Sequence, residues 1–159
     1  MKDLYLIRHA KSDWEYAHLN DFDRPLNERG LRDAPRMAAK ISKDWKRPEL
    51  ILSSPATRAY QTAQFFRETW NVSWNDFSLQ ESIYEATPEA LLETLSWFTS
   101  RVSRIAIIGH NPGLSLLIRQ LTGSDVELKT CCFAKVSTDH PEFKNSDCKL
   151  VDTLSPSDL

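Results

Sequence analysis

The chain has 159 residues, of which 41% are hydrophobic and 26% charged, and its formal net charge is −2 with histidine neutral. These values are ordinary for a globular domain that is long enough to bury a sizeable core. Because the chain has no overall basic field, general binding to nucleic acid or to an anionic membrane is disfavoured, and any positively charged site must be local.

Three short apolar runs have the composition of buried strands. They cover residues 4–7, 50–52 and 105–108, and each is bounded by polar or turn residues. Compact runs rich in Ile and Leu are typical of a parallel sheet that is covered on both faces. Residues 133–136 and 149–151 are expected to form late strands near the edge of the sheet.

The first predicted helix covers about residues 27–45. Its expected buried stripe is formed by Leu31, Ala34, Ala38 and Ile41. Pro35 interrupts this pattern, because proline removes one backbone hydrogen bond and should kink or delay the helix.

Three later helix starts share one signal, an N-cap residue followed by proline: Ser54-Pro55, Thr87-Pro88 and Asn111-Pro112. The apolar faces expected after them are Ala59, Ala63 and Phe66; Leu91, Leu92, Leu95 and Phe98; and Leu114, Leu117, Ile118 and Leu121, with Gly123 as a C-terminal stop. Residues 154–159 are expected to be a loop. Strands alternating with helices predict a single domain over residues 1–159, a three-layer α/β/α sandwich with a mostly parallel sheet and helices on both faces.

The cysteines and the apolar runs also indicate in which compartment of the cell the protein is expected. Cys131, Cys132 and Cys148 form no CxxC pair, so we expect free, buried thiols. No run approaches the ~20 residues of a membrane span, and the four apolar residues 4–7 are fewer than the ~7–15 of a signal-peptide core. We therefore expect a cytoplasmic protein without membrane attachment.

Basic and polar side chains directly follow three of the predicted strands. Arg8 and His9 follow the first, Arg58 lies shortly after the second, and His110 and Asn111 follow the third. Because ligands of open α/β sheets bind beyond the carboxyl ends of the strands, these groups should meet at one edge. Two of the segments also lead into helix N-termini, where free N–H groups and the helix dipole favour an anion. The sequence therefore predicts a phosphate pocket.

Five segments together resemble the histidine phosphatase superfamily, which has the phosphoglycerate-mutase-like fold. "LIRHAKS" is similar to its Arg-His signature, and "DFDRPLNERGLRDAPRMA", "LILSSPATRAYQTA", "ESIYEATPEALLETL" and "IAIIGHNPGLS" resemble its SixA-like phosphohistidine phosphatase branch. The resemblance runs from Leu4 to about Thr122, and the segment beyond it carries no comparable motif.

The resemblance implies a role for each matching residue. His9 matches the nucleophile that becomes phosphorylated, Arg8 and Arg58 match the two phosphate-binding arginines, and His110 matches the second histidine. The chemistry agrees with these roles, since a nucleophilic imidazole must be neutral and arginines offer forked donors to phosphoryl oxygens. A protonated His110 would add a third cation. Lys11 and Asn111 are expected to contribute to substrate binding.

The general acid has two candidates in one segment. Glu81 lies where larger members of the superfamily carry an acid, and Glu85 is a close competitor in the same segment. An alkoxide leaving group needs such an acid, whereas a phosphorylated imidazole leaves readily. The segment with His18, Asp21 and Asp23 fits no standard metal-ligand spacing, and the resemblance implies catalysis without metal or cofactor.

We therefore expect a phosphoric monoester or phosphoramidate hydrolase that works through a phosphohistidine enzyme intermediate. Its expected substrate is a phosphohistidine protein. The alternatives are a small-molecule phosphomonoesterase of the same superfamily, a phosphomutase, and a non-catalytic module that binds phosphate or phosphoprotein. We expect a monomer or weak dimer.

Overall fold

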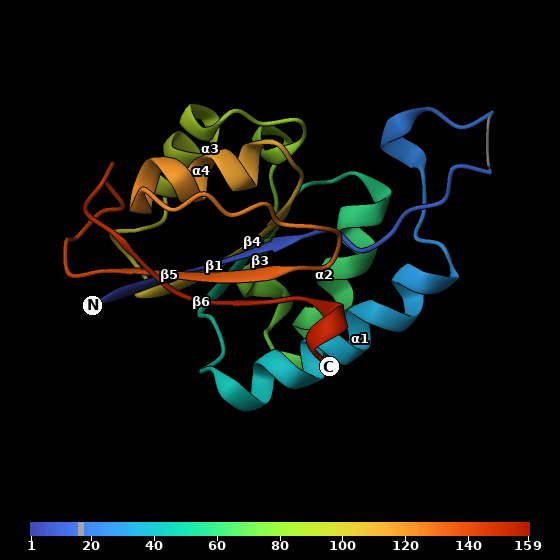
Figure 1. Ribbon diagram of the computed structural model, residues 1–159, viewed down its shortest axis with the longest axis horizontal. Helices are drawn as coiled ribbons and strands as arrows, with labels where there is room; N and C mark the ends of the chain where they lie inside the picture. The colour runs from blue at the N-terminus through green and yellow to red at the C-terminus, as the bar shows by residue number, and fades with distance from the viewer. Residues whose placement is uncertain (16–17) are drawn as a thin grey trace.

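The computed structural model describes residues 1–15 and 18–159. Among these residues, six strands form one sheet in the order β3-β2-β4-β1-β5-β6 (Figure 1). The strands are β1 (Lys2–Arg8), β2 (Leu50–Ser53), β3 (Phe77–Leu79), β4 (Arg104–Gly109), β5 (Phe133–Thr138) and β6 (Lys149–Leu154). Strands β1 to β4 run parallel to one another, whereas β5 and β6 are antiparallel to their neighbours.

Helices cover both faces of this sheet. Helices α1 (Glu28–Asp44) and α2 (Thr57–Trp70) lie on one face, and α3 (Pro88–Ser96) and α4 (Gly113–Thr122) lie on the other (Figure 1). Short 3-10 helices are found at Asp21–Asp23, Trp74–Asp76, Glu81–Ile83 and Pro156–Asp158. The predicted α/β/α sandwich with a mostly parallel sheet is therefore confirmed.

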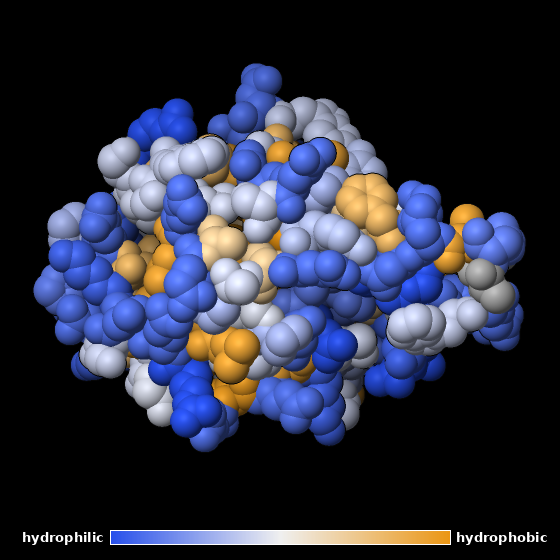
Figure 2. All heavy atoms as spheres, turned by 90° about the horizontal axis from the view of Figure 1, so that it is seen from above, coloured by the Kyte–Doolittle hydropathy of each residue, from blue (hydrophilic) through white to orange (hydrophobic). Residues whose placement is uncertain are grey.

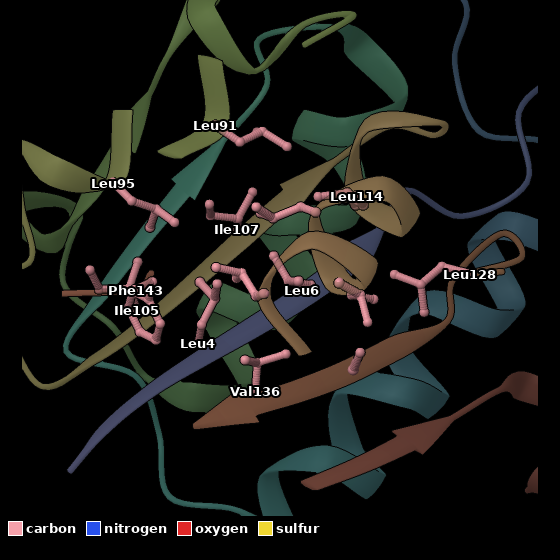
Figure 3. Packing of buried hydrophobic residues seen from close by; sticks show 14 of the residues in the cluster. Leu4, Leu6, Leu91, Leu95, Ile105, Ile107, Leu114, Leu128, Val136 and Phe143 are labelled. Atoms are coloured by element: carbon pink, nitrogen blue, oxygen red, sulfur yellow. The ribbon is translucent and has the colours of Figure 1, made fainter. Parts of the chain in front are cut away.

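The core consists of two apolar layers, one on each side of the sheet. Successive residues of a strand point to opposite faces, so Leu4 and Leu6 pack against α3 and α4 while Tyr5 and Ile7 pack against α1 and α2. Figure 3 shows the first of these layers, with Leu4, Leu6 and Ile107 lying below the side chains from the helices. Burial on both faces explains why β1 is apolar without interruption.

The first helix agrees with its prediction except at one residue. Asn27 is the N-cap of α1 and accepts a hydrogen bond from the Gly30 amide, and Pro35 lies inside the helix. The prediction that Leu31 belongs to the buried stripe is wrong, because its side chain is 47% exposed. Met37 is fully buried in the stripe, whereas Leu31 lies at the margin of it and lines a shallow surface groove beside α2.

Only one of the three predicted N-caps caps a helix. Thr87 accepts a hydrogen bond from the Ala90 amide at the start of α3. The predictions for Ser54 and Asn111 are wrong, since α2 begins at Thr57 and α4 begins at Gly113. Both residues lie in short connections after strand ends. Nδ2 of Asn111 donates to the carbonyl oxygen of Leu128, and the Ser54 hydroxyl makes a contact with His110 that is described below.

The remaining elements lie late in the chain, apart from one strand that the sequence did not reveal. β3 was not predicted, and the tail contains the 3-10 helix Pro156–Asp158 instead of a simple loop. The late strands β5 and β6 are confirmed, with β6 at the sheet edge.

All three cysteines are free and buried, as expected. In the described part of the chain, no helix is both long enough and apolar enough to cross a bilayer.

Candidate active site

Three neighbouring strands bring the predicted site together. β1 lies beside β4, and β4 lies beside β2, so their carboxyl ends form one continuous edge. The backbone keeps this edge in register beyond the strands: the His9 amide donates to the Gly109 carbonyl oxygen at 3.0 Å, and the Ser54 amide donates to the Ile108 carbonyl oxygen at 3.0 Å. His9, Arg58 and His110 consequently converge, with the two imidazole centroids 5.2 Å apart.

His9 is held as a neutral imidazole with one defined tautomer. Its Nδ1 lies 2.7 Å from the carbonyl oxygen of Ala10, which can only accept, so Nδ1 carries the proton and Nε2 carries the lone pair. Nε2 lies 3.4 Å from Nε of Arg58. Burial, reinforced by the charges of the neighbouring cationic groups, lowers the pKa of His9 to about 3 despite the opposing effect of the Ala10 hydrogen bond. Nε2 is therefore available as a nucleophile at neutral pH.

His110 has the opposite tautomer. Its Nδ1 lies 3.4 Å from Nη2 of Arg58, which can only donate, so Nε2 carries the proton and donates to Oγ of Ser54 at 2.8 Å. Burial and then the charge of Arg58 lower the pKa of His110 to about 4. His110 is thus neutral at pH 7, and it can act as the third cation only if an anion raises its pKa. A bound phosphate dianion would raise its pKa again.

Arg58 is engaged by a carboxylate that the sequence did not connect to it. Its Nη1 donates to the backbone oxygen of Asp21 at 2.6 Å, and its Nη2 donates to the carboxylate of Asp21 at 3.0 Å. The same carboxylate accepts from Arg24 at 2.7 Å and from the hydroxyl of Tyr84 at 2.7 Å. Partial burial would raise the pKa of Asp21, but the hydrogen bonds from Tyr84, Arg24 and Arg58 outweigh it and hold that pKa well below its usual range.

Arg8 supplies a second guanidinium to the site. Its Nη1 donates to the carbonyl oxygen of Leu128 at 3.1 Å. Its Nε is buried, and among the described residues no group accepts a hydrogen bond from it. Because Nε is closed off from solvent, the terminal nitrogens of Arg8 are the groups that can donate to a ligand in the pocket. Burial also lowers the pKa of Arg8.

These side chains line a cavity of about 300 Å³. The lining residues are Arg8, His9, Lys11, Ser12, Trp14, Asp21, Arg24, Arg58, Glu85, His110, Asn111 and Thr130. The structure thus brings together every predicted site residue except Glu81. Glu81 is exposed at the first position of its 3-10 helix and lies outside this lining, whereas Glu85 reaches the pocket from a left-handed backbone conformation with φ of 51°.

The pocket wall also contains Ser12, Trp14 and Arg24. Arg24 donates to Oγ of Ser12 at 2.6 Å and lies over the ring of Trp14, 3.6 Å from its centroid. The closest signal in the sequence was the cluster of Asp21 and Asp23 beside Arg24. Within the described part of the chain, no group of three His, Cys, Asp or Glu side chains is placed to hold a metal ion.

Comparisons with known proteins agree with this geometry. A family model described as the histidine phosphatase superfamily (branch 1) matches residues 4–87, which is more than half of the chain. An uncharacterized chloroplast protein of Arabidopsis thaliana is 36% identical over 137 residues, which cover 80% of this chain but only 62% of the plant protein. An uncharacterized protein of Mycobacterium leprae is 30% identical over 123 residues, covering 74% of this chain and 72% of that protein.

Solved structures with the same fold include two described as SixA. A candidate phosphohistidine phosphatase SixA from Agrobacterium tumefaciens has a TM-score of 0.84 and 29% identity, with 98% of both chains covered. The protein histidine phosphatase SixA complexed with tungstate has a TM-score of 0.86 and 21% identity, again over 98% of both chains. The second likeness bears on the fold alone.

Proposed function

Since the chain belongs to the histidine phosphatase superfamily, in its SixA-like branch, and is a phosphatase, we propose that it removes phosphoryl groups from phosphohistidine on a protein substrate through a phospho-His9 intermediate. One observation carries this proposal. Nε2 of His9 is unprotonated and lies beside Arg58, while Nδ1–H is fixed to the Ala10 carbonyl oxygen. A binding module would have no need for a neutral imidazole held in this way.

The proposed reaction has two balanced steps. In the first, the lone pair on Nε2 of His9 attacks phosphorus in line, the bond from phosphorus to the substrate imidazole breaks, and that imidazole leaves with the bond's electron pair and takes up a proton. In the second, water attacks the phosphoryl group, the P–Nε2 bond breaks, and inorganic phosphate is released. Nδ1 of His9 donates to Ala10 throughout, which holds the ring orientation in both steps.

The phosphoryl oxygens are held by cations and by neutral donors. The guanidinium groups of Arg8 and Arg58 line the pocket in which charge develops, and His110 can bind a third oxygen once the anion has raised its pKa. Because Arg8 and Arg58 supply the positive charge in this mechanism, a chelator should leave turnover intact.

The substrate class follows from the leaving group. A substrate imidazole leaves without strong acid assistance, whereas an alkoxide requires a proton donor. Glu85 lines the pocket, which favours Glu85 over Glu81 as the acid and supports a second candidate function, hydrolysis of small phosphate monoesters. Trp14 is 70% exposed at the pocket wall, so the cavity opens to a surface that a protein-borne phosphohistidine can approach.

The test compares a phosphohistidine peptide with p-nitrophenyl phosphate in the presence of EDTA, for the wild type and His9→Ala. We expect the wild type to hydrolyse the peptide with the higher kcat/KM, and His9→Ala to lose activity on both substrates. Ester turnover equal to peptide turnover would favour the monoesterase. Unchanged turnover in His9→Ala would exclude the phospho-His9 intermediate, and no turnover of either substrate by the wild type would favour a binding module.

A further inference from the structure

A second cavity of about 370 Å³ lies beside the phosphate pocket. The two cavities share three lining residues, Glu85, His110 and Asn111. The two cavities are therefore neighbours, bounded in common by these three residues. The mechanism proposed above makes no use of this space.

The walls of the second cavity are mainly apolar. Ala86 and Pro88 form one side at the start of α3, and Pro112 and Leu116 form the other at the start of α4. Leu116 is 45% exposed, so its side chain is accessible to a group that enters the cavity. Figure 2 looks onto the face covered by α3 and α4, where small hydrophobic patches interrupt mainly hydrophilic side chains.

The two sides of this cavity are packed closely at its base. A Cβ atom on Gly113 would collide with the carbonyl oxygen of Ala86, so only glycine lets the start of α4 approach the loop before α3. The cavity is consequently a formed feature of the fold, because its walls are fixed against each other at that contact.

The charge of the second cavity argues against an acidic occupant. Among the described residues, neither lysine nor arginine lines it, and Glu85 contributes its one carboxylate. A substrate carboxylate placed there would lose water without gaining a lysine or arginine partner and would face Glu85, which is unfavourable on both counts.

We propose that the second cavity is a specificity subsite for an apolar side chain that flanks the phosphorylated residue of a polypeptide substrate. This inference rests on the proposed function, because it assumes that the phosphoryl group is carried by a polypeptide. Consecutive Cα atoms are about 3.8 Å apart, so a side chain one or two positions from the phosphorylated residue can reach a cavity that shares three walls with the first.

The test uses phosphohistidine peptides that differ only in whether leucine or glutamate flanks the phosphorylated residue, at one and two positions on each side. We expect the wild type to prefer leucine at one of these positions by about tenfold in kcat/KM. Leu116→Arg should remove or reverse this preference, since it replaces an apolar wall with a cation. The matched control is Leu31→Arg on α1, because Leu31 and Leu116 are similarly exposed, at 47% and 45%, and lie on opposite faces of the sheet.

The ratio between two peptides is measured within one enzyme preparation, so partial misfolding of a variant cancels. Equal kcat/KM for leucine and glutamate peptides at every position, or the same loss of preference in both arginine variants, would overturn the subsite while leaving the phosphatase proposal intact.

A second arm measures binding of phosphonate analogues of the same peptides, which cannot be hydrolysed, to the wild type. Tighter binding of the leucine analogue by about tenfold would support the subsite, whether or not the parent peptides are turned over. Absence of turnover of the parent peptides would contradict the proposed hydrolysis. Equal affinities would overturn the subsite independently of catalysis.

Discussion

Arg58 and Asp21 are joined by two hydrogen bonds, one to the Asp21 backbone oxygen at 2.6 Å and one to its carboxylate at 3.0 Å. Both terminal nitrogens of the guanidinium, which suit a phosphate, therefore donate to Asp21, one to its backbone oxygen and one to its carboxylate. Asp21 orients Arg58, but its charge opposes an incoming phosphate dianion. Orientation of Arg58 favours phosphate binding, whereas the negative charge of Asp21 opposes it. Substitution of Asp21 can separate these two effects on phosphate affinity.

Asp21→Asn should make inorganic phosphate a stronger competitive inhibitor, with an inhibition constant about tenfold lower than that of the wild type. The amide keeps one oxygen that can accept from Arg58 or Tyr84, while the negative charge beside the anion site is removed. Inhibition assays with phosphate and vanadate at constant ionic strength measure this change.

The matched control is Asp23→Asn, because Asp23 belongs to the same 3-10 helix but does not line the pocket. We expect its inhibition constants to equal those of the wild type. Weaker phosphate binding by Asp21→Asn would instead show that orientation of Arg58 outweighs charge repulsion.

Arg58→Lys should lower kcat/KM about a hundredfold although it preserves the charge. A lysine ammonium cannot contact the Asp21 backbone, the Asp21 carboxylate and a phosphoryl oxygen with the fixed geometry of a guanidinium. Steady-state kinetics on the phosphohistidine peptide measure the loss. Arg67→Lys in the same helix, whose guanidinium lies over Trp74 away from the pocket, should have less than a twofold effect.

Glu85→Gln should reduce hydrolysis of p-nitrophenyl phosphate and other esters more than hydrolysis of phosphohistidine, by about tenfold in the ratio of the two. The reason is that Glu85 lines the pocket and an ester oxygen depends more on a proton donor than an imidazole does. Glu81→Gln, only four residues earlier in the chain, is the control and should leave the ratio unchanged. A loss in Glu81→Gln without one in Glu85→Gln would reverse the assignment.

The two buried histidines should make folding sensitive to mild acid. Unfolding lets each imidazole bind a proton near its ordinary pKa of 6.5, whereas in the folded protein burial lowers the pKa to about 3 for His9 and about 4 for His110. The unfolded state then binds more protons, so their contribution to stability is complete above about pH 6.5 and is lost as the pH falls toward 4 and then 3. Chemical denaturation of the wild type at pH 7 and pH 5 should show this loss.

His110→Asn should reduce the difference in unfolding free energy between pH 7 and pH 5 by about 2 kcal/mol, because one neutral buried imidazole is removed. His140→Asn is the control, since the His140 side chain is 51% exposed. An equal pH dependence in the wild type and His110→Asn would contradict the lowered pKa of His110.

The fold could be predicted from local patterns wherever burial is periodic or continuous. β1 and β4 are apolar throughout because both faces are covered, and α1 shows its buried stripe despite Pro35. β3 has only three residues, too few to establish a pattern, and its pairing with β2 depends on the rest of the sheet. The prediction that Leu31 is buried was wrong because hydrophobic periodicity identifies the buried face of a helix but not where that face ends.

The part of the site that could be predicted consists of residues that lie at or shortly after the ends of strands. Arg8, His9 and His110 are fixed by strand ends, and Arg58 follows within one helical turn of α2. The contact between Asp21 and Arg58 spans 37 residues and depends on how the loop after β1 folds back, which has no local signature. Ser54 was read as a helix cap, whereas its hydroxyl accepts from His110 across 56 residues. Such partners are set by tertiary geometry alone.

The position of the site on the three adjacent parallel strands β2, β4 and β1 has a consequence for local opening. The amides of His9 and Ser54 donate to β4 at the centre of the sheet, and the amide of Arg8 donates to Cys132, directly before β5. Amides of this kind usually exchange with solvent deuterium only when the whole domain unfolds. A destabilising substitution in the distant core should therefore leave the site intact in every molecule that is still folded. The total activity should then decrease by the same fraction as the folded population.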